Sequence, residues 1–447
     1  MSRSRNACSR SSTRPHRQRG VATMVIVMVL FFIISLVAAY TNRNLIFEQR
    51  TSANQYRSTQ ALEAADAGLE WALSMLNHGR ITASCQDSTV TTDTTFRSRY
   101  LAIDQTNGNV RTMPVGGAPL QSSCVFVDDT TGWNCSCPST GEPVLTLPSA
   151  TAVHPAFRVR FHQITPLPPA PPRQPGVIHI EAVGCTRLDA ECLKFEGRGV
   201  TNEGRAVVSM TVALAGNLAS PPLAAVLAGG AVTGAAKVYN TKISDSGITV
   251  HAGGTVAWSP ISVTPSILQS SPGTPAMLSK LESDPSVAPE AVAPYSAADR
   301  MFATVFNMWP ATFRDQPAAL RLTSCGAVCT STDVNNALIL NPRRPIWVPG
   351  SLLISSSVGT PAEPVLLVIG GDLEFVTSST ISGLVYMRKS VANVSGAGQI
   401  TGAFIAESDV NAVSSPVFVY DDSVLRALRS ETGSFVRVPG SWRDFGW

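Results

Sequence analysis

The chain has 447 residues, of which 15% are charged, and it contains 33 glycines and 31 prolines. This length exceeds one ordinary hydrophobic core and predicts two domains beyond any membrane segment, and the composition favours strands, turns and long loops over a helical enzyme. The formal net charge is only +3, and because the N-terminal leader supplies it, nucleic-acid binding is not predicted.

The first feature along the chain is a basic leader followed by a long apolar run. Residues 1–20 carry six arginines and no acidic residue, and Val21 to Tyr40 form a stretch without charge. At 1.5 Å per residue, a helix of about twenty residues spans the roughly 30 Å hydrocarbon core. The positive-inside rule keeps the leader cytoplasmic and places the rest of the chain across the membrane.

Residues 41–77 are expected to continue as an amphipathic helix, with Gly79 as its C-cap. Apolar side chains recur at steps of three and four residues and form one stripe: Leu62, Ala65, Leu69, Ala72, Leu73 and Leu76. No proline interrupts residues 21–79. The pattern predicts one long rod, half in lipid and half packed on a globular head, with the leucines of the stripe facing the head's own sheet.

Nine cysteines are present, and all except Cys8 follow the apolar run. An even number of exported cysteines fits an oxidising compartment such as the bacterial periplasm. Cys185 and Cys192 flank one short loop, and Cys325 and Cys329 flank another, so each couple is expected to form a disulfide. The remaining four allow three pairings: Cys85, Cys124, Cys135 and Cys137. Zinc is the competing interpretation, but these spacings without partnered histidines are poor for a metal.

The N-terminal region resembles that of PilX-type minor pilins of type IV pili. The family pattern is an E-R-x-x-x-N motif followed by Q-A-hydrophobic-x-A-A-E/D-A-x-L. With a one-residue slip in the first motif, the matching residues are Glu48, Arg50, Asn54, Gln60, Ala61, Ala64, Ala65, Asp66, Ala67 and Leu69. The resemblance covers the chain from its start to about residue 80, and its leader-plus-helix combination is specific.

This resemblance implies that a prepilin peptidase cuts after Gly20 and methylates the new amino group of Val21. It implies a single-pass protein of the inner membrane whose C-terminal bulk lies in the periplasm or on the pilus. The implied partners are other minor and major pilins, the prepilin peptidase, the inner-membrane assembly machinery and membrane lipid. No cofactor is expected.

Val25 departs from the pattern of most pilins, which carry a glutamate at the fifth mature position. A carboxylate in lipid is unfavourable unless it meets a partner such as a neighbour's N-terminal amine, and Val25 cannot accept that bond. The departure resembles noncanonical minor pilins and the K-type pseudopilins of type II secretion, which are assigned to fibre tips. The valine fits a subunit that initiates or caps the fibre. The alternative is that it merely improves the membrane anchor.

Residues 80–150 are polar and weakly patterned, and they are expected to form loops and short strands. Three runs rich in β-branched residues follow, at 157–164, 177–185 and 206–214. The segment TPLPPAPPRQPG (165–176) separates the first two and is expected to be an extended loop. The three runs resemble the antiparallel sheet on which a pilin helix packs.

After residue 222 the sequence changes to short apolar runs separated by Gly, Ser and Asn. Residues 381–399 and 400–415 form the clearest repeat, and a spacing of nineteen pairs Ile381 with Ile400, Gly383 with Gly402, Val391 with Val410 and Val394 with Val413. Segments beginning at residues 247, 350 and 370 look like weaker copies. A period near twenty predicts the stacked rungs of a short β-helix, or solenoid; a curled β-sandwich is the alternative.

The predicted fold class is therefore α+β, with a long transmembrane pilin helix packed on an antiparallel sheet and a β-rich, solenoid-like domain after it. In chain order the parts are a leader (1–20), the helix (21–79), a pilin-like domain with disulfides (80–220) and the C-terminal domain (221–447) with an insert (259–335). A helix over Ala297–Met308 is expected in the insert, and Asp421 or Asp422 is expected to cap a second helix that closes the solenoid end.

No pattern predicts catalysis or metal binding, because the six histidines are scattered and no nucleophile or phosphate-loop motif is present. A β-helix can host sugar-cleaving carboxylates, and four acidic residues on neighbouring predicted rungs keep a glycosidase open as a function: Asp372, Glu374, Glu407 and Asp409. The predicted function is a minor pilin-type assembly subunit that is not an enzyme. A type II secretion pseudopilin also fits the sequence, as does a secreted adhesin released at Val37-Ala38-Ala39.

Overall fold

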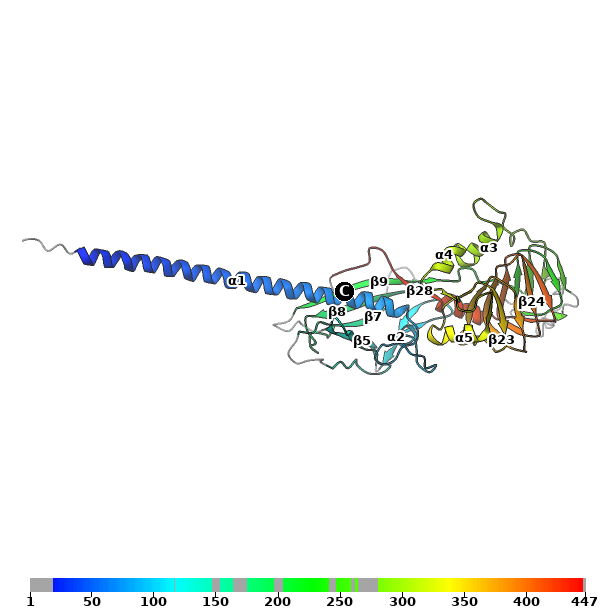
Figure 1. The fold of residues 1–447 in the computed structure, drawn as a ribbon, viewed down its shortest axis with the longest axis horizontal. Coiled ribbons are helices and arrows are strands. Elements are labelled where there is room, and N and C mark those ends of the chain that lie inside the picture. The colour runs from blue at the N-terminus through cyan, green and yellow to red at the C-terminus, as the bar shows by residue number, and fades with distance from the viewer. Residues whose placement is uncertain are drawn as a thin grey trace, which may run out of the picture. The chain divides into compact units, whose positions relative to one another are not determined.

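The computed structural model describes residues 19–115, 117–146, 153–163, 175–196, 204–240, 247–258, 262–263 and 280–444. Most of the predicted leader, most of the proline-rich segment 165–176 and much of the insert between 259 and 279 lie outside the described residues. The chain divides into two compact units, Met1–Thr59 and Gln60–Trp447, and Figure 1 shows the elements of both.

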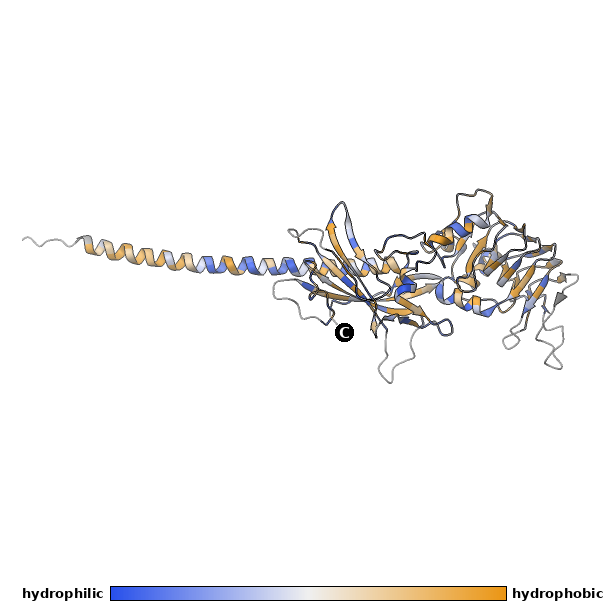
Figure 2. Cartoon of the chain, turned by 90° about the horizontal axis from the view of Figure 1, so that it is seen from below, coloured by the Kyte–Doolittle hydropathy of each residue, from blue (hydrophilic) through white to orange (hydrophobic). Residues whose placement is uncertain are grey.

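The first unit is the long N-terminal part of helix α1 (Arg19–Leu76), which confirms the predicted rod. Every side chain from Val21 to Thr59 is exposed. In Figure 2 the helix is apolar over its first part and then becomes polar. Among the described residues, one helix is long and apolar enough to cross a membrane, and it is this one.

The last turn of α1 differs from the expectation for Gly79. The helix ends at Leu76, and the side-chain amide of Asn77 donates to the carbonyl of Leu73 at 3.1 Å. Gly79 is not among the glycines with positive φ, so its expected role as a left-handed C-cap is wrong. A glycine is required there for close approach, because a Cβ atom would lie 1.9 Å from the carbonyl oxygen of Leu340.

The end of α1 packs on an antiparallel sheet in the second unit, with strand order β28-β9-β8-β7-β5-β6. Its strands are β5 (Gln121–Asp128), β6 (Gly132–Ser136), β7 (Ala156–His162), β8 (Val177–Cys185), β9 (Arg205–Gly216) and β28 (Gly433–Arg437). The three predicted strands are β7, β8 and β9, which are adjacent and antiparallel as expected. Residues 80–150 are more regular than predicted because they also supply β5 and β6.

Smaller elements lie between α1 and this sheet in sequence. They are α2 (Phe96–Tyr100), β1 (Leu101–Ile103), β2 (Val110–Thr112), β3 (Pro114–Val115) and β4 (Ala118–Pro119). Strands β1 and β2 form one antiparallel pair, and β3 and β4 form another. Phe96 and Tyr100 of α2 are buried in the core shared by α1 and the sheet.

Small residues let α1 approach the sheet closely. At Gly184 of β8, a Cβ atom would lie 2.2 Å from the carbonyl oxygen of Ala61 and 2.3 Å from the amide nitrogen of Ala65. Leu69 and Leu76 are fully buried, but Leu62 is 37% exposed, so its expected contact with the sheet is wrong. Leu62 shares a helix face with Leu69 but lies about two turns earlier, at the start of the packed part of α1, where Ala61 is buried and Leu62 is not.

The rest of the head is a parallel β-solenoid, which confirms the predicted fold and excludes the sandwich. One sheet contains β10 (Val226–Ala228), β12 (Lys237–Asn240), β13 (Val250–Ala252), β15 (Ser262–Val263), β16 (Lys280–Leu281), β17 (Leu320–Arg321), β19 (Ile346–Val348), β21 (Val365–Ile369), β23 (Thr380–Met387), β25 (Gln399–Ala406) and β27 (Val417–Tyr420). The other contains β11 (Val232–Gly234), β14 (Val256–Trp258), β18 (Val328–Thr330), β20 (Ser351–Ile354), β22 (Leu373–Phe375), β24 (Val391–Ser395) and β26 (Asp409–Val413).

The repeat register is correct for the first strand of each rung and shifted for the second. Ile381 pairs with Ile400, as the nineteen-residue spacing predicts. Val391, however, pairs with Asp409 and not with Val410, and Ser395, not Val394, pairs with Val413, so this spacing is eighteen. The reason is that the turn between β25 and β26 has one residue fewer than the turn between β23 and β24.

The rungs do not stack in chain order. Strands β10, β11 and β12 pair with β25, β26 and β27, so the first rung in sequence lies beside the last one. The β13 and β14 strands extend the stack beyond that rung, and β17 and β18 extend it at the other end. Strands β16, β17 and β18 come from the predicted insert, which therefore contributes to the solenoid.

Four helices among the described residues accompany the solenoid: α3 (Ala297–Phe306), α4 (Pro310–Asp315), α5 (Ser331–Leu340) and α6 (Asp422–Glu431). The predicted helix in the insert is α3, whose Phe302 packs edge-on against Tyr386 with ring centroids 5.1 Å apart. Asp421, one of the two expected caps, accepts from the backbone amides of Ser423 and Val424 at the start of α6.

The chain returns from α6 to the antiparallel sheet. Strand β28 pairs antiparallel with β9, and Gly433 lies opposite Gly216. Residues 433–444 are predicted from the sequence to belong to the solenoid domain, whereas in the structure β28 and the bridge of Arg443 with Ser209 place them at the sheet. The solenoid is therefore inserted between two neighbouring strands of the sheet.

Candidate functional site: the assembly helix and the head junction

The N-terminal part of α1 presents a continuous apolar surface. Gly20 and Val21, the predicted processing junction, lie in its first turn. The side chain of Val25 is 55% exposed, and that of Phe31 is 72% exposed. A contiguous apolar surface of this kind marks a site for lipid or for other proteins.

The structure pairs all eight cysteines after the apolar run. The expected Cys185–Cys192 and Cys325–Cys329 disulfides are present. Among the three pairings open for the remaining four, the structure has Cys85–Cys137 and Cys124–Cys135. The latter joins β5 to β6, where the two cysteines are direct cross-strand partners. No group of potential metal ligands is found in the part of the chain that the structure describes.

The four carboxylates that a glycosidase would use lie at the rung turns or on rung strands. Asp372 accepts from Lys389 at 2.6 Å and from the side-chain amide of Asn393 at 3.0 Å. Burial opposes its ionisation, but these hydrogen bonds lower the pKa of Asp372 overall. Asp409 accepts from the amide of Ala231 on the neighbouring rung at 2.7 Å, and Glu374 is exposed.

Glu407 is the buried member of this group. It accepts from the Nε of Arg388 at 2.9 Å. Burial raises the pKa of Glu407, although Arg388 acts in the opposite direction. Arg388 also contacts Asp299 at 2.8 Å and so connects this rung turn to α3. These contacts give Asp372, Asp409 and Glu407 a role in holding rungs and helices together.

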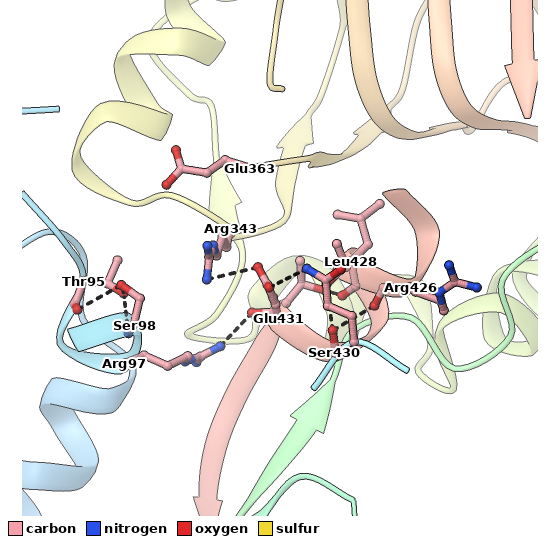
Figure 3. Close-up of polar contacts among 12 residues, drawn as sticks. Thr95, Arg97, Ser98, Arg343, Glu363, Arg426, Leu428, Ser430 and Glu431 are labelled. Carbon is pink, nitrogen blue, oxygen red and sulfur yellow. Dashed lines mark hydrogen bonds and ion pairs between the residues drawn. The ribbon is translucent and has the colours of Figure 1, made fainter. Parts of the chain in front are cut away.

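A polar junction joins the end of α1, the sheet and the solenoid, and its centre is Arg97 of α2 (Figure 3). The guanidinium donates to three backbone carbonyls: Leu76 at 3.1 Å, Glu431 at 2.8 Å and Gly433 at 2.8 Å. Leu76 ends α1 and Glu431 ends α6, so one cation lies at the negative ends of two helix dipoles. Arg97 also lies over the ring of Phe435, 4.9 Å from its centroid.

The charge of Arg97 persists at neutral pH. Burial lowers its pKa to about 10, with a further lowering from Arg343 and an opposing effect from Glu431. The Glu431 side chain contacts Arg343 at 3.0 Å and accepts from Gln105 at 3.0 Å.

Two further contacts reinforce this junction. Asn77 exchanges two hydrogen bonds with the backbone of Phe435 in β28: its side-chain amide donates at 2.9 Å and its side-chain carbonyl accepts at 2.7 Å. Arg80 donates from its backbone to Leu340 of α5 at 3.1 Å, and its side chain meets Glu363 at 2.9 Å. Sequence reasoning missed the junction, because its members come from segments without a repeating pattern.

A long apolar helix whose end packs on an antiparallel sheet is a pilin-like α+β arrangement. Residues 19–70 match a family model described as PilX N-terminal, which confirms the resemblance of this segment to PilX-type pilins. No curated protein matches the chain. Among solved structures, the competence-associated pilin ComZ from Thermus thermophilus matches at 12% identity and a TM-score of 0.21, over 87% of this chain and 97% of that one. A TM-score this low supports no argument.

Proposed function

We propose that this protein is a minor pilin-type subunit of a type IV pilus. The observation that carries the proposal is the exposed, uncharged surface of α1 from Val21 to Tyr40, inside the segment that matches the PilX N-terminal model. Packing of this surface against other pilin helices supplies most of the assembly interface. The β-rich head supplies the specificity of contacts, and its role is structural and not catalytic.

Processing and location follow from the same segment. The prepilin peptidase removes the leader after Gly20 and methylates Val21. Before assembly the subunit is held in the inner membrane by α1, with its head in the periplasm, where the paired cysteines are stable. Its partners are major and minor pilins and the inner-membrane assembly machinery.

The absence of a carboxylate at residue 25 supports a position at the end of the fibre. A subunit with Val25 cannot accept a charged bond from the amine of an incoming neighbour. The same observation favours the second candidate function, a pseudopilin of type II secretion. The two candidates differ in which fibre requires the protein.

Deleting the gene and scoring pili and secreted proteins in the same cells tests both candidates. A minor pilin is required for normal piliation while secretion continues, and a pseudopilin gives the reverse result. If the deletion affects neither piliation nor secretion, both candidate functions are contradicted. In cells without the prepilin peptidase, the protein is expected to keep its leader and run at a higher mass; an unchanged mass contradicts the proposed processing.

A further inference from the structure

The solenoid is attached to the sheet through two chain connections that lie side by side. Strand β9 leads into it after Gly216, strand β28 leaves it at Gly433, and these two residues are direct partners. Two adjacent connections form a hinge axis unless other contacts resist rotation about them. Contacts that can do so are those of Arg97 with the end of α6 and those of Arg80 with Leu340 and Glu363.

Arg97 is suited to this task by the shape of its side chain. Its planar fork offers five donors in a fixed geometry, and three of them satisfy carbonyls that belong to α1, α6 and β28. Two of these elements, α6 and β28, are distant in sequence, since Arg97 is 334 residues from Glu431 and 336 residues from Gly433. Lysine carries the same charge on a point-like group and cannot reproduce this planar set.

Asn77 holds β28 to the end of α1 on the sheet side of the junction. Its side chain pairs with the backbone of Phe435 in both directions, 358 residues away, while it also caps Leu73 of α1. Both residues thus connect the end of α1 to the start of β28. The ring of Phe435 is buried beneath the Arg97 guanidinium.

We propose that Arg97, through its bond to the end of α6, is the positioning residue that fixes the inserted solenoid to the sheet and the end of α1, so that they move as one body. The meaning of this rigidity rests on the proposed function, because a head displayed by a fibre must keep a fixed orientation to present its contact surface. Arg97 acts through the elements that it joins.

The test uses the full-length protein in detergent, with Arg97→Met as the variant and Arg429→Met as the matched control. Arg429 belongs to α6, is exposed, and lies two residues from Glu431. Amide exchange is measured at the end of α6 and in β28, and in the rung strands β21 and β23. Spin labels at Ala102 and Val413, both exposed, report the distance between β1 on the sheet side and the solenoid.

Arg97→Met is expected to speed exchange at the end of α6 and in β28 by about tenfold or more, because three carbonyls lose a charged donor. The rung strands keep their protection, and the distance distribution broadens. Arg429→Met matches the natural protein in every measurement. Arg97→Lys broadens the distances as well, because it restores the charge without the fork.

Unchanged exchange and an equally narrow distance distribution in Arg97→Met would overturn the proposal. Faster exchange in the rung strands too would also overturn it, since Arg97 would then serve folding as a whole. If Arg97→Met does not fold, Arg97→Lys decides by the same two readouts. None of these measurements depends on piliation, so this inference and the proposed function fail separately.

Discussion

Single side chains that bind backbone groups determine where elements of the head end. Arg97 and Asn77 do this at the junction, and Asp421 does it at the start of α6. Asp128 is a further case, because it holds the turn between β5 and β6. Its carboxylate accepts from the backbone and hydroxyl groups of Thr130 and Thr131, at distances from 2.6 to 3.2 Å.

Asp128→Asn is predicted to weaken the β5–β6 hairpin in a pH-dependent way. Hydrogen bonds, led by the Thr130 hydroxyl, lower the pKa of Asp128 from 3.8 to about 2. A lowered folded-state pKa stabilises the fold above the unfolded pKa, and this stability is lost as the pH falls through about 2. The gap in hairpin exchange protection between natural protein and variant should therefore be constant above about pH 4 and shrink below it.

Asp129→Asn is the control, because Asp129 is the exposed neighbour of Asp128 in the same turn. In the Asp129→Asn variant, the amide exchange protection of the hairpin should equal that of the natural protein at every pH. A gap for Asp128→Asn that stays constant from neutral pH to pH 2 would show that its ionisation does not contribute to holding the turn.

At the scale of single residues, the sequence predicted contacts between residues that lie close together in the chain. The Cys185–Cys192 and Cys325–Cys329 pairs could be predicted because their partners are seven and four residues apart. The roles of Arg97 and Asn77 could not be predicted, because their partners in α6 and β28 lie more than 330 residues away and form no motif. The Cys85–Cys137 pair depended on the position of β6, which the composition of residues 80–150 does not reveal.

Among the elements, the contact between α1 and the sheet combines close backbone approach with a few large side chains. Gly184 and the alanines of α1 bring the two surfaces together. Leu69 is fully buried in this contact, whereas Leu62, about two turns earlier, is 37% exposed. The two leucines therefore form a matched pair on one helix.

Leu69→Ala is predicted to lower the free energy of unfolding of the sheet region by about 2–5 kcal/mol, because it removes buried apolar contacts and leaves a cavity. Leu62→Ala should change it by less than about 0.5 kcal/mol. Amide exchange of β7 and β8 in the full-length protein measures both. Equal effects of the two substitutions would show that the packed part of α1 does not begin between Leu62 and Leu69, as the structure has it.

Periodicity predicted α1, the strands β7 to β9 and the existence of rungs, because each repeats a hydrophobic pattern over several turns or strands. It failed where a turn changes length, as in the pairing of Val391 with Asp409. It also missed β16, β17 and β18, which are two or three residues long. Strands this short have too few side chains to show alternation.

For the whole molecule, the order of contacts differs from the order of the chain. The first solenoid rung lies beside the last, and the C-terminal strand returns to the sheet that precedes the solenoid. A repeat period indicates that rungs stack, but it carries no information on which rung neighbours which. The fold class could therefore be predicted from the sequence, and the insertion of one domain into the other could not.

The retained N-terminal helix is the basis of every assembly role proposed for this protein. Peptide mass mapping of the mature N-terminus, on protein from membrane and pilus fractions, tests it most directly. The account predicts a chain that begins with methylated Val21 and stays in these fractions. A mature chain that begins at Tyr40 and is found free in solution would contradict it.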